Sequence, residues 1–88
     1  MKLLKFYAEW CQPCKMLSTV INESKADIES LMVTIEEVDV DNNMELAKKY
    51  GIRGVPTLVM VEESGQEVRR KSGYMSNEEL IRFVEGRV

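Results

Sequence analysis

The chain has 88 residues, of which 44% are hydrophobic and 31% are charged, and its formal net charge is -3. So short a chain can bury about two thirds of its unfolded surface, which predicts a single domain over residues 1–88. The mildly acidic balance provides no basic surface for nucleic acid, and the sequence has no apolar run long enough to span a membrane. Because Lys5 and Glu9 interrupt the N-terminal apolar stretch and no small-residue cleavage site follows it, we expect a cytoplasmic protein. We also expect a monomer.

The pattern of apolar residues predicts the element order β-α-β-α-β-β-α. An apolar strand ends near Glu9, and helical periodicity follows it, with Met16 expected in the core. The β-branched stretch 31–40 predicts a second strand, parallel to the first, because a strand-helix-strand unit makes a right-handed crossover. A second helix is expected to begin at Met44, which we also place in the core, and to stop at Gly51. A hairpin of strands 57–61 and 67–72 follows it, and the last helix starts with a capping box at 76–79.

The only two cysteines, Cys11 and Cys14, lie between the first strand and the first helix. A helix N-terminus favours an anion, since its N–H groups are unsatisfied and its dipole is positive there. We therefore expect the pKa of the Cys11 thiol to lie below the ordinary value of about 8.5, which makes it a better nucleophile. Cys14 is one helical turn further on, close enough to close a short disulfide ring, and Pro13 is tolerated in a first turn.

Half of a zinc site is the alternative interpretation of this pair. The chain has no histidine and no other cysteine, so a four-ligand site would need a second chain. We therefore expect no metal, and thiol-disulfide chemistry in a reducing compartment is favoured over a structural role.

A second constellation, Gly51-Ile52-Arg53-Gly54-Val55-Pro56-Thr57, lies between the second helix and the third strand. By itself, a proline at the head of a strand is usually a loop residue with a trans peptide bond. Together with Trp10-Cys11-Gln12-Pro13-Cys14-Lys15 and Gly73, however, this segment resembles the thioredoxin family, in order and separation, over nearly the whole chain.

The resemblance implies an α/β, thioredoxin-like fold with a four-stranded mixed sheet, order 2-1-3-4, flanked by three helices. The N-terminal strand and helix of full-length thioredoxins have no counterpart in this sequence. The resemblance also implies a cis Val55-Pro56 bond that faces the cysteines, with the backbone beside it offered to an extended substrate segment.

The implied activity is reduction of protein disulfides by dithiol exchange, with Cys11 as the nucleophile and Cys14 as the resolving thiol. No cofactor is implied beyond the Cys11–Cys14 disulfide, and electrons would come from a thioredoxin reductase-like protein or from glutathione. The residues expected to rim an apolar substrate groove around an exposed Cys11 sulfur are Trp10, Gln12, Pro13, Gly54, Val55, Pro56, Gly73 and Tyr74, with Met75 extending it.

The sequence departs from the family at three charged or polar positions. Gln12 stands where thioredoxins usually carry glycine. Lys5 and Glu37 stand where the family carries a buried aspartate and a nearby lysine, so the charges are exchanged. The two side chains could be solvated, with only their stems buried. Alternatively, they form a partly buried pair near Cys14, in which Glu37 acts as acid and base and Lys5 favours thiolates.

Two other functions fit the same pattern. A glutathione-dependent glutaredoxin agrees with the short length, although the loop at 72–76 lacks the Gly-Gly-Asp type of signature used for the tripeptide. The second alternative is a non-catalytic binding subunit with a thioredoxin fold, because a fold does not fix a function.

Overall fold

The computed structural model describes residues 1–87, and in this range the elements follow the predicted order. They are β1 (Lys2–Tyr7), α1 (Gln12–Ser30), β2 (Thr34–Asp39), α2 (Met44–Lys49), β3 (Thr57–Val61), β4 (Glu67–Ser72) and α3 (Asn77–Glu85).

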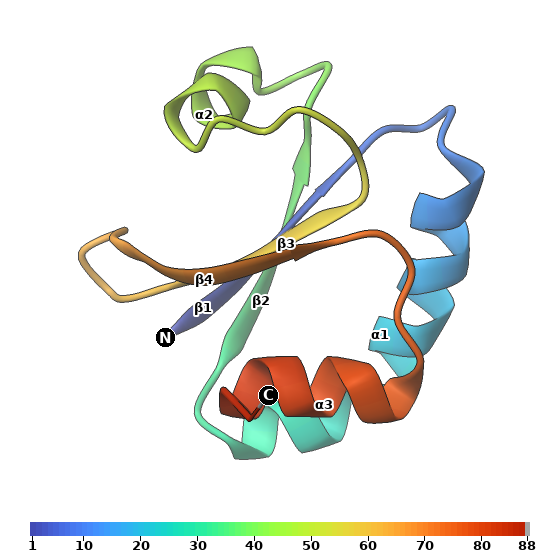
Figure 1. Ribbon diagram of the computed structural model, residues 1–88, viewed down its shortest axis with the longest axis vertical. Helices are drawn as coiled ribbons and strands as arrows, with labels where there is room; N and C mark the ends of the chain where they lie inside the picture. The colour runs from blue at the N-terminus through green and yellow to red at the C-terminus, as the bar shows by residue number, and fades with distance from the viewer. Residues whose placement is uncertain (88) are drawn as a thin grey trace.

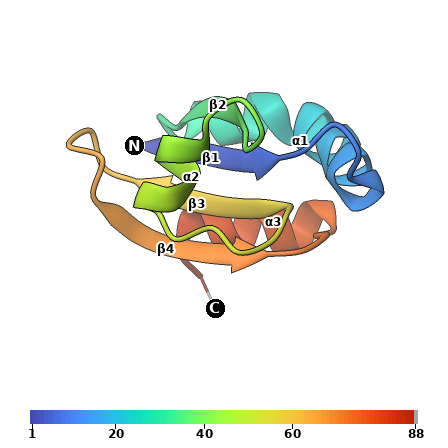
Figure 2. The same ribbon diagram turned by 90° about the horizontal axis from the view of Figure 1, so that it is seen from above.

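The strands form one four-stranded sheet in the order β2-β1-β3-β4, which confirms the prediction (Figure 2). β1 runs parallel to β2, while the β1–β3 and β3–β4 pairs are antiparallel. This topology brings the end of β1, the start of β3 and the end of β4 to the same edge of the sheet.

Helices cover both faces of the sheet, with α1 and α3 on one side and α2 on the other (Figure 1). Along β1 the side chains alternate, so Leu3 belongs to the core beneath α1 and α3, whereas Leu4 and Phe6 belong to the core beneath α2. The larger core contains residues from α1, α3, the sheet and the segments before β2 and α3, namely Leu3, Leu17, Val20, Ile21, Ile28, Val33, Leu58, Met60, Met75, Leu80, Phe83 and Val84.

The second strand begins at Thr34 and not at residue 31. The main-chain N–H groups of Leu31 and Met32 donate to carbonyls of the last turn of α1, and Met32 has a φ of 64°. These two residues therefore end the helix and reverse the chain, which is why a β-branched pattern alone overestimated the strand.

Met16 and Met44 are exposed, so their predicted core positions are wrong. In α1 the side chains that face the sheet include Cys14, Leu17 and Ile21, which are spaced at three and four residues. Met16 lies just outside that stripe, and Met44 is the first residue of α2.

The closing helix begins with the predicted capping box. The Ser76 hydroxyl accepts from the Glu79 N–H at 3.2 Å, and the Glu79 carboxylate accepts from the Ser76 N–H at 3.2 Å. The hydrogen bond that the Ser76 N–H donates to the carboxylate lowers the pKa of Glu79. Within the part of the chain that the structure describes, no helix is both long enough and apolar enough to cross a membrane.

Candidate active site

The candidate site lies at the edge of the sheet where three loops meet. Thr57 at the start of β3 pairs with Phe6 near the end of β1 and with Ser72 at the end of β4. The Gly73 N–H donates to the Pro56 carbonyl at 2.9 Å, which joins the loop after β4 to the loop before β3. The register of the strands thus places three segments that are distant in the sequence around the cysteines.

Cys11 and Cys14 form a disulfide with their Cα atoms 5.2 Å apart. Cys11 is the N-cap of α1, and its Sγ accepts a hydrogen bond from the Cys14 N–H at 3.2 Å. The Cys11 N–H donates to the Ala8 carbonyl at 3.1 Å, which fixes the turn between β1 and the helix. A sulfur at this position accepts a hydrogen bond from a free N–H and lies at the positive end of the helix dipole, as expected from the sequence.

The two cysteines are buried, with exposed fractions of 4% for Cys11 and 1% for Cys14. The expectation of an exposed Cys11 sulfur is therefore wrong for the disulfide form. Ala8 is buried with the two cysteines, and Val40 and Val55 pack against this small cluster.

The Val55-Pro56 peptide bond is cis, as the family resemblance implied. The Val55 carbonyl oxygen lies 3.7 Å from the Cys11 Sγ. The Gly54 carbonyl accepts from the Thr57 hydroxyl at 2.7 Å, which holds this loop against the start of β3.

The residues predicted to rim the groove lie on the loops that meet at this edge of the sheet, and they differ in how much of each is exposed to solvent. Trp10 and Tyr74 are largely exposed, at 71% and 51%, while Pro56 is buried. Gln12, Pro13 and Gly54 are also exposed, and Val55 and Gly73 are partly buried. Met75 is wholly buried in the core beneath α3, so its predicted place on the rim is wrong; the chain turns inward directly after Tyr74.

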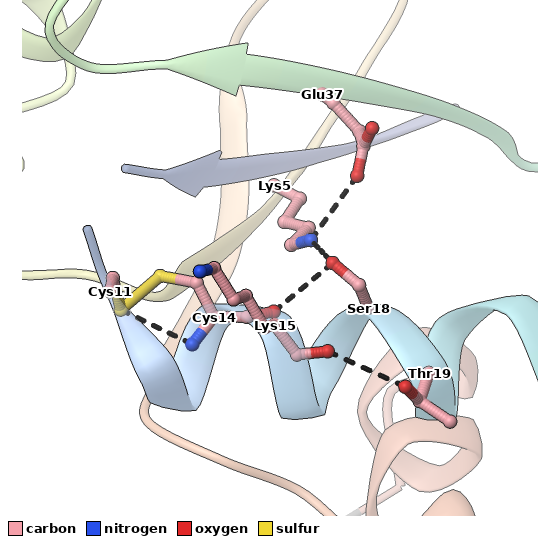
Figure 3. A network of polar contacts seen from close by, with 7 residues as sticks. All are labelled: Lys5, Cys11, Cys14, Lys15, Ser18, Thr19 and Glu37. Carbon is pink, nitrogen blue, oxygen red and sulfur yellow. Dashed lines mark hydrogen bonds and ion pairs between the residues drawn. A yellow bond between two sulfur atoms is a disulfide. The ribbon is translucent and has the colours of Figure 1, made fainter. Parts of the chain in front are cut away.

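Lys5 on β1, Glu37 on β2 and Ser18 on α1 form a polar cluster beside Cys14 (Figure 3). Lys5 pairs in register with Glu37 of β2, and its Nζ donates to the Glu37 carboxylate at 3.2 Å. The Lys5 ammonium also donates to the Ser18 hydroxyl. Lys5 is 1% exposed and Glu37 57%, so only the lysine is a buried charge and the carboxylate remains in contact with solvent.

Acidic side chains surround Tyr7, which follows Lys5 by two residues on β1. Desolvation raises the pKa of the Tyr7 hydroxyl, and the negative charges of Asp39, Glu37 and Glu9 raise it further. The phenol therefore stays protonated at neutral pH. The Lys5 ammonium lies 5.2 Å from the centre of the Tyr7 ring, so the positive charge has an aromatic neighbour as well as a carboxylate.

Sequence reasoning missed two residues of the site. Ser18 lies four residues after Cys14 in α1, and residues at this spacing share a helix face, so the pattern contained a usable signal. The Asp41 carboxylate accepts from the Trp10 indole N–H at 3.1 Å. Asp41 follows β2 at the same edge of the sheet, but which of several loop carboxylates would reach the indole depends on the tertiary fold.

Among residues 1–87, no group of three or more histidine, cysteine, aspartate or glutamate side chains is arranged to hold a metal ion.

A disulfide closed across the first turn of a helix, beside a cis-proline loop, defines the class of thiol-disulfide exchange proteins. The thioredoxin family model matches residues 1–86. A thioredoxin of Rickettsia bellii is 38% identical over 86 residues, which are 98% of this chain and 80% of the relative.

Solved structures agree with this match. A mutant thioredoxin from Halobacterium salinarum has a TM-score of 0.83 at 38% identity, covering 97% of this chain and 72% of that chain. A malarial protein has a TM-score of 0.83 at 28% identity, covering 99% of this chain and 96% of that chain. The chain belongs to the thioredoxin family. It is a thiol-disulfide oxidoreductase that acts on disulfides, and neither the glutaredoxin nor the non-catalytic binding subunit is favoured.

Proposed function

We propose that the protein reduces protein disulfides, with Cys11 as the attacking thiol and Cys14 as the resolving thiol. The observation that carries this assignment is the place of Cys11 at the N-cap of α1, where its Sγ accepts the Cys14 N–H. An anionic sulfur is stabilised there by a hydrogen bond and by the helix dipole. Cys14 lies deeper and has no such cap.

Reduction of one substrate disulfide takes two steps. The Cys11 thiolate attacks one sulfur of the substrate disulfide, the substrate S–S bond breaks, and the other substrate sulfur leaves as a thiolate that takes up a proton. Cys14 then loses its proton and attacks the Cys11 Sγ, so that the Cys11–Cys14 disulfide forms and the second substrate thiol leaves. The substrate gains two electrons and the protein loses two.

An extended substrate segment is proposed to lie along the loop that contains Val55 and the cis Pro56. The backbone of Val55 is next to the Cys11 sulfur, so a segment paired with it would carry its disulfide to the nucleophile. The other residues proposed to contact substrate surround this loop, namely Trp10, Gln12, Pro13, Gly54, Gly73 and Tyr74. The exposed rings of Trp10 and Tyr74 offer apolar contact area on two sides.

Glu37 is proposed to accept the Cys14 proton during the second step, and Lys5 to favour the thiolate. The exposure of the Glu37 carboxylate supports this role, because a proton received there can pass on to solvent. The Lys5 ammonium, being buried, interacts with nearby charges through a medium that screens less than water.

The assignment is tested by trapping with a disulfide-containing protein substrate. Cys14→Ser is expected to accumulate a mixed disulfide on Cys11, because the first step remains and the second is blocked. Cys11→Ser is the matched control and is expected to accumulate none on Cys14. Mass spectrometry of the non-reduced adducts reads out both variants, and equal trapping on the two cysteines would contradict the assigned order.

A thioredoxin reductase-like protein is proposed as the electron donor, in a cytoplasmic, monomeric cycle of redox homeostasis. The oxidised protein is expected to be reduced faster by NADPH and a thioredoxin reductase than by glutathione, measured by loss of NADPH absorbance and by thiol titration. The loop after β4 supports this choice, since Ser72-Gly73-Tyr74 carries an exposed ring where glutathione-binding chains use a Gly-Gly-Asp type of signature. Faster reduction by glutathione would instead support glutathione as the donor.

A further inference from the structure

Ser18 joins the resolving cysteine to the buried charge beneath it (Figure 3). Its hydroxyl donates to the Cys14 carbonyl at 3.1 Å and is also bonded to the Lys5 ammonium. An ammonium can only donate and a carbonyl can only accept, so the single hydroxyl hydrogen of Ser18 is used on Cys14 and its lone pair on Lys5. The chain of hydrogen bonds therefore has one direction, from Lys5 through Ser18 to Cys14.

A small cavity connects the same groups. It has a volume of about 190 Å³ and is lined by Lys5, Tyr7, Ala8, Glu9, Cys14, Lys15, Ser18 and Glu37. A polar cavity of this size has room for water, which can carry a proton between groups that do not touch. Cys14 itself is buried, but it borders this pocket, whose lining residues Glu9, Lys15 and Glu37 are exposed to solvent.

Solvent screens the charges around this cavity to different degrees. Glu9 in the turn after β1, Lys15 on α1 and Glu37 on β2 are exposed, so solvent weakens their fields. Asp39 acts on the neighbouring Tyr7, whose pKa is raised and which stays neutral. Asp39 is also buried but does not line the cavity, whereas Lys5 is the buried charge among the lining residues, so its field on Cys14 is the least screened of theirs.

We propose that Ser18 is a positioning residue, which holds the Lys5 ammonium beneath Cys14 so that the Cys14 thiolate is stabilised while it attacks Cys11. This inference rests on the proposed order of the two cysteines. In the mixed disulfide the Cys14 proton passes to Glu37, directly or through water in the cavity, and the thiolate attacks the Cys11 Sγ. The bond between Cys11 and substrate breaks, and its electron pair leaves with the substrate sulfur, which takes a proton from solvent.

Without the Ser18 hydroxyl, the ammonium keeps Glu37 as its hydrogen-bond partner and is drawn toward the solvent side of the cavity. A cation that moves away from a sulfur stabilises the thiolate less. Ser18→Ala is therefore expected to slow the second step by about three- to tenfold at pH 7, and to move its pH profile upward by about half to one pH unit.

The assay uses the reduced full chain and an excess of dithiobis(nitrobenzoate), which releases one coloured thiolate at each step of the exchange. Stopped-flow absorbance then separates attack by Cys11 from resolution by Cys14. Ser18→Ala is expected to slow only the second release, and Ser18→Thr, which keeps the hydroxyl, to restore it. Thr19→Ala is the matched control, because Thr19 makes the same kind of bond to the Lys15 carbonyl, at 3.5 Å, on the exposed side of α1.

Lys5→Met tests the same inference without altering Ser18. It removes the ammonium and keeps an unbranched apolar stem, so it is expected to slow the second release at least as much as Ser18→Ala. The double variant is expected to be no slower than Lys5→Met, since Ser18 then has no cation to hold.

The inference is overturned if Ser18→Ala leaves the second release and its pH profile unchanged, or if Thr19→Ala slows it equally. It is also overturned if Ser18→Ala slows the Lys5→Met background by its full factor, because Ser18 would then act without Lys5. Loss of the first release in Cys14→Ser, by contrast, would refute the proposed role of Cys11.

Discussion

Leu17→Ala is expected to lower the free energy of unfolding by about 3–5 kcal/mol, a large part of the total for a domain of this size. Leu17 is wholly buried in the core that joins α1 to α3 and the sheet. Truncation removes the transfer free energy of three carbon atoms and leaves a cavity that rigid strands on one side cannot close. Urea unfolding of the oxidised protein, followed by circular dichroism, measures the loss.

Met16→Ala is the matched control, since it lies next to Leu17 on the same helix but is 52% exposed. Its expected cost is about 0.5 kcal/mol or less, as for other surface positions. The disulfide is expected to close in both variants, because Cys11 and Cys14 lie within a single turn whose geometry α1 sets locally. Similar losses for the two variants would mean that α1 is not anchored to the sheet through Leu17.

The features that the sequence predicts well are those set by neighbours along the chain. The cysteine pair at a helix start, the hairpin and the capping box at Ser76 each follow from a few adjacent residues, and the parallel first pair of strands follows from the right-handed crossover rule. The sheet order and the cis bond at Val55-Pro56 followed from the family resemblance, because one sequence does not reveal which strands pair across a long connection.

The errors in the methionine positions have a common physical origin in side-chain direction. Met16 and Met75 are both apolar, yet one is half exposed and the other wholly buried, because the tertiary fold decides which side chain turns inward. Lys5 is the opposite case. Strand alternation places it on the same face as Leu3, toward α1, but a lysine at such a position is normally solvated, so neither interpretation could be preferred from the sequence.

Exchanging the charges of Lys5 and Glu37 is the second large effect that we expect. Lys5→Glu alone is expected to cost about 3–5 kcal/mol, because it breaks a pair with a buried member and sets the new carboxylate beside Glu37. Glu37→Lys alone is expected to cost less, since its side chain is 57% exposed and the new ammonium can turn into water. The double exchange is expected to recover about 1–3 kcal/mol relative to the sum of the single changes.

Recovery in the double variant is expected to be incomplete, for a reason that lies in Ser18. A carboxylate at position 5 accepts hydrogen bonds, so Ser18 has to donate to it and release the Cys14 carbonyl, which it bonds in the natural chain. Urea unfolding at pH 7 gives the four free energies of the cycle. The exposed pair Lys71–Glu79, whose charged atoms are 3.6 Å apart, is the control, and its exchange is expected to show a coupling of about 0–1 kcal/mol. A coupling no larger at Lys5–Glu37 than at Lys71–Glu79 would show that burial of the lysine does not strengthen its ion pair.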